Sequence, residues 1–214
     1  MIAAGPTTQV DSIDAAMMRR CLQLSEQSVA AGERPFGAVL AAGTVIVAAA
    51  GNRVEADRDV TRHAGVVALA DAQRLLGKKH LSGCTLYSIV EPCAMCSFAI
   101  RECGIQRVVY ALGSPVMGGA SRWDVLTDPG LSTSMPQVFG KPPKILGGVL
   151  AADAADVWRK WNPLFWYFIK RKGYLVLPRH HASTSPISKE RTWLSRARGL
   201  LIGKVSRSQA RTSG

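Results

Sequence analysis

Glu91-Pro92-Cys93-Ala94-Met95-Cys96 is the stretch that best predicts both the fold and the chemistry of this chain. It follows a β-prone run, residues 85–90, and opens a helix-like run. Proline is favoured in the first turn of a helix, because its missing N–H would have no partner there. A helix is expected from about residue 94, and if Pro92 stands at its start, the sulfurs of Cys93 and Cys96 project from the first turn toward one point. The positive end of that helix favours thiolates, the form of cysteine that binds metals.

A third candidate ligand lies upstream, where His63 opens a second helix-like run. A Cys-x-x-Cys pair alone is ambiguous between a metal site and a redox pair. One His and two Cys supply three zinc ligands and leave a fourth position for water, which is the composition of a catalytic zinc site. The alternative is a satisfied core histidine beside two buried thiols. The joint pattern, with each part at a predicted helix start, favours zinc.

Several further stretches match one known family in their order along the chain. They are Pro35-Phe36-Gly37-Ala38-Val39, Gly51-Asn52, His63-Ala64 and Arg107-Val108-Val109-Tyr110, together with the Glu91–Cys96 stretch. Over roughly residues 12–130, the sequence resembles the cytidine deaminase-like superfamily, and within it the bacterial nucleoside, guanine and tRNA-adenosine deaminases. The resemblance implies a three-layer α/β/α fold with a five-stranded mixed sheet. The alternation of helix-like and strand-like runs independently predicts a layered α/β domain.

The resemblance also implies a function. The chain is expected to be a zinc-dependent aminohydrolase that deaminates a nucleobase, nucleoside or related amino-heterocycle by attack of zinc-bound hydroxide. The residues that it assigns are the Zn²⁺ ligands His63, Cys93 and Cys96, and the substrate contacts Asn52, Ala64 and Phe36. In the family, a Glu two residues after the His moves the protons. Gly65 occupies that catalytic position here and has no side chain with which to do so.

Gly65 leaves three interpretations open. The first is a natural member of the family that has lost deaminase activity and kept its fold and zinc. In the second, a working enzyme takes its proton shuttle from Glu55, Asp57 or Asp59, in the preceding polar segment. The third is a sequence altered at this position. Two functions therefore stand beside the small-molecule aminohydrolase: a tRNA adenosine deaminase, and a catalytically silent zinc-binding scaffold.

The composition is that of an ordinary globular protein, with 214 residues, 47% hydrophobic and 20% charged. No apolar run reaches the ~18 residues of a membrane span, and the N-terminus lacks the pattern of a signal peptide. Five cysteines make an odd count, of which two have a metal-like arrangement. We therefore predict a reducing, cytoplasmic location, with Cys21, Cys84 and Cys103 as small buried hydrophobes.

The net charge of +12 is concentrated at the C-terminus. From Lys172 onward there are nine Lys and Arg against one Glu, which is +8 of the total. We predict a loose leader over residues 1–10, a zinc deaminase-like domain over 11–171, and a basic tail over 172–214. The tail is expected to be partly disordered or a short amphipathic helix, and it makes RNA a second class of partner. Relatives imply a homodimer, and the aromatic-rich residues 154–170 are expected to form one helix in the core or at the dimer surface.

Overall fold

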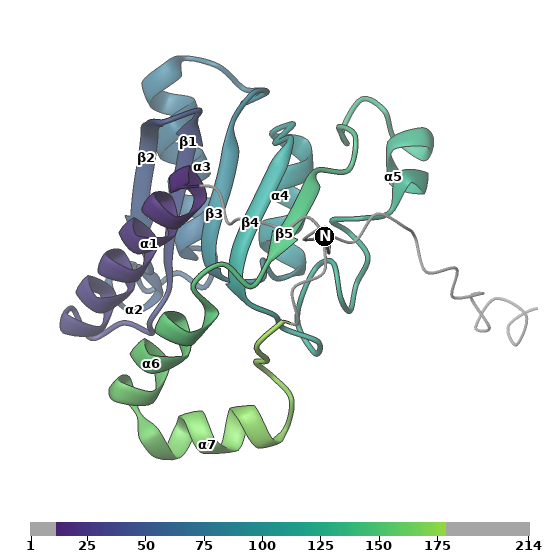
Figure 1. The fold of residues 1–214 in the computed structure, drawn as a ribbon. Coiled ribbons are helices and arrows are strands. Elements are labelled where there is room, and N and C mark those ends of the chain that lie inside the picture. The colour runs from purple at the N-terminus through teal and green to yellow at the C-terminus, as the bar shows by residue number, and fades with distance from the viewer. Residues whose placement is uncertain (1–11, 179–214) are drawn as a thin grey trace, which may run out of the picture. The chain divides into compact units, whose positions relative to one another are not determined.

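The computed structural model describes residues 12–178 of the chain (Figure 1). The loose leader predicted for residues 1–10, and the tail beyond residue 178 with its amphipathic helix, lie outside the described residues. Within them, no helix combines the length and the apolar character needed to cross a membrane.

Five strands form one mixed sheet in the order β2-β1-β3-β4-β5. The strands are β1 (Gly37–Ala42), β2 (Val45–Gly51), β3 (Thr85–Val90), β4 (Arg107–Leu112) and β5 (Lys144–Gly147). β1 pairs antiparallel with β2 and with β3, whereas β3, β4 and β5 run parallel to one another. Gly43 joins β1 to β2 with φ +58°, a conformation that favours glycine, and so closes a β-hairpin. The five-stranded mixed sheet predicted from the sequence is confirmed.

Helices cover both faces of this sheet (Figure 1). The helices of the described chain are α1 (Ser12–Ala30), α2 (Val54–Asp57), α3 (Ala64–Leu76), α4 (Ala94–Glu102), α5 (Pro129–Ser134), α6 (Ala151–Trp161) and α7 (Pro163–Arg171). Side chains alternate along each strand, so Val39 and Tyr87 pack with α1 and α6, whereas Leu40 and Leu86 pack with α3 and α4. Two cores on opposite faces confirm the three-layer α/β/α fold. Cys21, Cys84 and Cys103 are buried free thiols, as predicted.

The prediction of one helix over residues 154–170 is wrong. The segment forms two helices, α6 and α7, which meet at a corner between Trp161 and Pro163. Proline lacks an N–H and clashes with the carbonyl four residues earlier, so α6 ends before it. The Asn162 side chain then caps α7 by accepting a 2.9 Å hydrogen bond from the Phe165 N–H. The corner turns α7 away from the line of α6.

The chain then returns to the end of β4. Gly113 and Val176 exchange two backbone hydrogen bonds of 2.9 Å, and the Ser114 hydroxyl donates to the Tyr174 carbonyl at 3.1 Å. Leu175 is buried between these contacts. The segment predicted as the beginning of the basic tail therefore starts with residues that pair with the domain.

A buried carboxylate links α1 to the sheet. Asp14 is 2% exposed, and its two oxygens accept hydrogen bonds of 2.6 Å from the Arg107 guanidinium. The Tyr87 hydroxyl donates a further bond of 3.0 Å to the same carboxylate. Burial raises the pKa of Asp14, but the hydrogen bonds from Arg107 and Tyr87 and the charge of Arg107 outweigh it. The pKa of Asp14 is therefore held below its ordinary value.

Replacing Asp14 with Asn is expected to lower the free energy of unfolding by about 3 kcal/mol at neutral pH, because it leaves the Arg107 charge without its partner. A depressed folded-state pKa stabilises the protein above the unfolded pKa of about 4, and this contribution is lost as pH falls through the folded value. Denaturant unfolding at pH 7 and at pH 3 should therefore show a smaller difference between the two proteins at the lower pH. Asp156→Asn, which removes an exposed pair with Arg159, is the control and should cost under about 1 kcal/mol.

Candidate functional site

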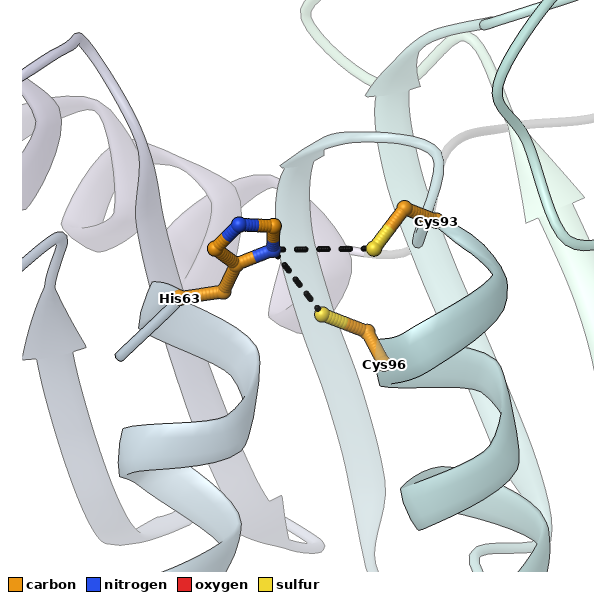
Figure 2. Close-up of side chains that lie close together, drawn as sticks. All are labelled: His63, Cys93 and Cys96. Carbon is orange, nitrogen blue, oxygen red and sulfur yellow. Dashed lines mark hydrogen bonds between the residues drawn. The ribbon is translucent and has the colours of Figure 1, made fainter. Parts of the chain in front are cut away.

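The three predicted metal ligands converge at the N-termini of two helices. His63 is the N-cap residue of α3 and Cys93 that of α4, while Cys96 lies in the first turn of α4. Figure 2 shows the three side chains pointing toward one another. The His63 Nδ1 atom lies 3.5 Å from the Cys93 sulfur and 3.6 Å from the Cys96 sulfur. All three ligand atoms lie within 4.8 Å of one another, which makes the group able to hold a metal ion.

The start of α4 agrees with the helix expected from about residue 94. Pro92 does not open the helix; the first helical residue is Ala94, and Cys93 precedes it in an extended conformation with φ −68° and ψ 173°. Neither the Cys93 nor the His63 side chain makes a capping hydrogen bond to its own helix. Both are therefore directed at each other and at Cys96, and the positive ends of both helices face the cluster.

The chemistry of the donor set fits zinc. The Cys96 thiol donates a hydrogen bond that lowers the pKa of Cys93, against the opposing effect of burial, and the His63 imidazole lowers it further. The same hydrogen bond, together with burial, raises the pKa of Cys96. One imidazole nitrogen and two sulfurs supply three ligands of the types that zinc prefers, with a fourth position left for a substrate or water. Binding a metal there displaces the shared proton.

Gly65 lies in the first turn of α3, beside this cluster. A Cβ atom built at Gly65 would lie 3.8 Å from the Cys96 sulfur, which is ordinary van der Waals contact. A side chain at this position would therefore start out beside the metal ligands, with no steric obstacle. Gly118 is the opposite case, because a Cβ there would collide with the Glu91 carboxylate.

The acidic residues considered as an alternative proton shuttle are not brought to the cluster. Asp57 accepts hydrogen bonds from Arg53 and Arg62, and these bonds hold its pKa at about 2. Asp59 accepts from the backbone and side chain of its own turn. Glu55 lies exposed on α2. None of these three residues lines the cavity described below.

Glu91 is buried, and its oxygens are fully engaged. They accept hydrogen bonds from the backbone N–H groups of Ser114, Ala120 and Ser121, and from the Ser121 hydroxyl, at 2.7–3.1 Å. The carboxylate therefore fastens the loop after β4 against the start of α4. With four donors already on it, Glu91 is a structural support for this loop and a poor proton carrier.

A cavity of about 480 Å³ opens beside the cluster. Its lining includes His63, Ala64, Gly65, Cys93 and Cys96, and also Phe36. Two of the three predicted substrate contacts, Ala64 and Phe36, thus face the cavity. The third, Asn52, is absent from the lining. Its Nδ2 donates a 2.9 Å hydrogen bond to Glu33, and its buried Oδ1 has no partner among residues 12–178.

The far wall of the cavity is aromatic, which sequence reasoning missed. Trp158 of α6 and Phe165 and Phe168 of α7 line it, together with Tyr174. Trp158 is 3% exposed and packs edge-on against Phe36, whereas Phe165 and Phe168 are 37% and 50% exposed. The sequence predicts that this segment forms core or dimer surface. Trp158 does belong to the core, and the same ring also lines the cavity. The available signal was the Asn-Pro corner followed by two Phe residues three positions apart, on one face of α7.

Comparison with known proteins places the metal-ligand residues inside a matched family region. A sequence model of the family described as "Cytidine and deoxycytidylate deaminase zinc-binding region" matches residues 11–112. This range contains His63, Cys93 and Cys96, and it spans the chain from α1 to β4.

Individual relatives cover different shares of the chain. A tRNA(Ile)-lysidine synthase from Deinococcus deserti is 39% identical over 150 residues, which are 70% of this chain and 26% of that protein. This chain thus spans about a quarter of that relative. A tRNA-specific adenosine deaminase from Aquifex aeolicus is 34% identical over 116 residues, 54% of this chain and 77% of the relative. A solved structure of an NE0047 mutant in complex with 8-azaguanine superposes with a TM-score of 0.60 at 26% identity, covering 71% of this chain and 85% of the other.

Proposed function

The chain belongs to the cytidine deaminase-like superfamily of zinc deaminases, and from this premise we propose that it is a zinc-dependent aminohydrolase acting on a nucleobase, nucleoside or related amino-heterocycle. The observation that carries the proposal is the convergence of His63, Cys93 and Cys96 within 4.8 Å on the wall of an aromatic-lined cavity. These three residues are the proposed zinc ligands. The relative that binds 8-azaguanine supports a planar heterocycle as the ligand.

The residues of the cavity suit such a reaction. Zinc, when bound, lowers the pKa of a coordinated water and supplies hydroxide at neutral pH. Phe36 and Trp158 offer apolar surface against which a flat ring can pack. The N–H groups of the first turn of a helix have no partner within the helix, so the Ala64 N–H at the cavity wall is the proposed donor to an acceptor on the edge of the base.

The described lining of the cavity lacks a free carboxylate that could transfer protons during deamination. Deamination needs a group that takes a proton from the nucleophile and returns protons to the ring nitrogen and the leaving amine. Among the described residues lining the cavity, Glu91 is the only carboxylate, and four donors already engage it. We therefore propose that Gly65 occupies the position of the proton shuttle and limits turnover. The same observation keeps a zinc-binding scaffold as the second candidate function.

A tRNA adenosine deaminase is the remaining alternative within the family. The name of the Aquifex aeolicus relative supports it, as does the basic sequence from Lys172 onward. A small-molecule substrate is preferred because residues of α7 and of the segment that returns to β4 form one wall of the cavity and limit its volume to about 480 Å³. The RNA partner, the homodimer and the cytoplasmic location stay predictions.

Ammonia release from the zinc-loaded full chain tests the proposal. The panel consists of amino-purine and amino-pyrimidine bases, their nucleosides and unmodified tRNA. We expect slow release from at least one base or nucleoside, and its loss in Cys93→Ala, because that variant lacks a proposed zinc ligand. Release from tRNA alone would favour the tRNA alternative. Zinc content near one per chain with no release from any compound would favour the scaffold.

A further inference from the structure

Two basic side chains line the cavity without a partner. Arg34 and Lys172 belong to the same lining as Cys93 and the aromatic wall. Both residues are exposed, and across residues 12–178 neither side chain has a hydrogen-bond or ion-pair partner. Some cations of the described chain are paired, as Arg107 is with Asp14 and Arg62 with Asp57, but these two do not line the cavity. The cavity therefore carries two available positive charges.

The fold fixes the base of each side chain at the cavity. Arg34 stands between Phe36 and the buried Glu33, whose carboxylate accepts the N–H groups at the start of α2. Lys172 is the C-cap residue of α7, and its N–H donates to the Phe168 carbonyl at 3.0 Å. Gly173, with φ +71°, then reverses the chain toward β4. Both side chains are thus anchored at the backbone and free at the charged end.

No available negative charge balances them inside the cavity. Glu91 is the one acidic residue among the described lining residues, and its charge is met by three backbone N–H groups and a hydroxyl. Two cysteine thiolates would balance the charge of a bound Zn²⁺, so the metal centre adds no net charge. The unbalanced charge of the cavity therefore comes from Arg34 and Lys172.

We propose that Arg34 and Lys172 form a subsite for a phosphate group of the substrate, while the base of the same nucleotide lies between the aromatic wall and the metal ligands. A guanidinium binds two phosphate oxygens in its planar fork, and an ammonium adds a point charge. This inference rests on the proposed function and narrows its substrate to a phosphorylated nucleotide. The phosphate belongs either to a free mononucleotide or to a nucleotide within an RNA strand.

The sequence gives both sources a physical basis. The cavity, with a volume of about 480 Å³, suits a mononucleotide. The residues beyond the described Pro178 include eight Lys and Arg and one Glu, a net charge of +7, and such a composition adds sequence-independent affinity for a phosphate backbone. Both sources share the contact of one phosphate with Arg34 and Lys172, so the same two substitutions test both.

Calorimetric titration of the zinc-loaded full chain is the test, because it measures binding without turnover. The probes are AMP, CMP and GMP, their parent nucleosides and free bases, and a short single-stranded RNA, at fixed salt. We expect at least one monophosphate to bind about 10-fold or more tightly than its nucleoside. Arg34→Gln and Lys172→Gln should each remove most of that difference and leave nucleoside affinity unchanged. Lys170→Gln is the matched control, since Lys170 carries the same charge near the same helix end and does not line the cavity.

The outcomes separate the two proposals. One outcome is that the RNA binds while the monophosphates do not, with Arg34→Gln and Lys172→Gln weakening RNA binding more than Lys170→Gln does. In that case the phosphate subsite is supported, and the phosphate that it binds belongs to an RNA strand. If nucleosides and monophosphates bind equally and the two substitutions change nothing, the subsite is refuted while the aminohydrolase proposal survives. If no base, nucleoside, nucleotide or RNA binds, both proposals fail.

Discussion

Replacing Cys96 with Ala is expected to abolish zinc binding, from about one ion per chain in the unaltered protein to a trace. Cys96 is one of three proposed ligands, and its sulfur lies 3.6 Å from the His63 nitrogen. The two remaining ligands are expected to hold zinc poorly, because the affinity of a site for Zn²⁺ depends on how many ligand atoms the protein supplies. The cluster also joins the start of α3 to the start of α4, so loss of the metal should lower the melting temperature. Metal analysis and thermal unfolding of both proteins, prepared without chelator, measure the two effects.

Cys84→Ala is the matched control for that experiment. Cys84 is a buried free cysteine outside the cluster, so its replacement removes a thiol from the core and leaves the three proposed ligands in place. We expect this variant to keep its zinc and to lose only the stability of a small core truncation. Zinc content of Cys96→Ala equal to that of the unaltered chain would contradict the ligand assignment, as would a metal-free unaltered protein.

The metal cluster was predictable because each of its parts carries a local signal. Cys93 and Cys96 lie at the start of one helix, and His63 lies at the start of another. The three ligands can therefore be predicted once both helix starts are recognised in the sequence. The layered fold was predictable for a similar reason, since strand-like runs and helix-like runs alternate along the chain. The helix expected from about residue 94 begins at Ala94, and Pro92 lies two residues before it.

The rest of the site depends on contacts that no local pattern encodes. Phe165 and Phe168 reach the cavity because α6 and α7 meet at a corner and the following segment pairs with Gly113. Composition alone could not separate this wall from an ordinary core. Asn52 shows the reverse case, because this residue of a matching motif donates a hydrogen bond to Glu33 and does not belong to the cavity lining. In both cases the position of the side chain relative to the cavity depends on tertiary packing.

Replacing Gly65 with Glu is expected to raise the rate of ammonia release by about 10²–10⁴-fold, the usual contribution of a positioned general acid–base group. The Cβ of the new side chain would stand 3.8 Å from the Cys96 sulfur, an ordinary van der Waals contact, and because Gly65 lines the cavity, we expect the carboxylate to extend into it beside the metal ligands. A carboxylate in the first turn of α3 is also favourable toward the helix dipole. Removing a helical glycine should stabilise the fold by up to about 1 kcal/mol. Ammonia release from the compound that responds best in the panel measures the gain.

Gly65→Gln separates proton transfer from packing, because glutamine has the size of glutamate and cannot carry the proton. We expect it to keep zinc, fold like the unaltered chain and show no comparable gain. Two results would overturn the assignment of Gly65. If the unaltered chain already turns over at an enzyme's ordinary rate and Asp57→Asn or Asp59→Asn abolishes it, the shuttle lies in the preceding segment despite the ion pairs seen there. If Gly65→Glu holds zinc and stays inert toward every base, nucleoside, nucleotide and tRNA, then the cavity is not catalytic. The chain would then be a zinc-binding scaffold that has kept the deaminase fold and lost the deaminase activity.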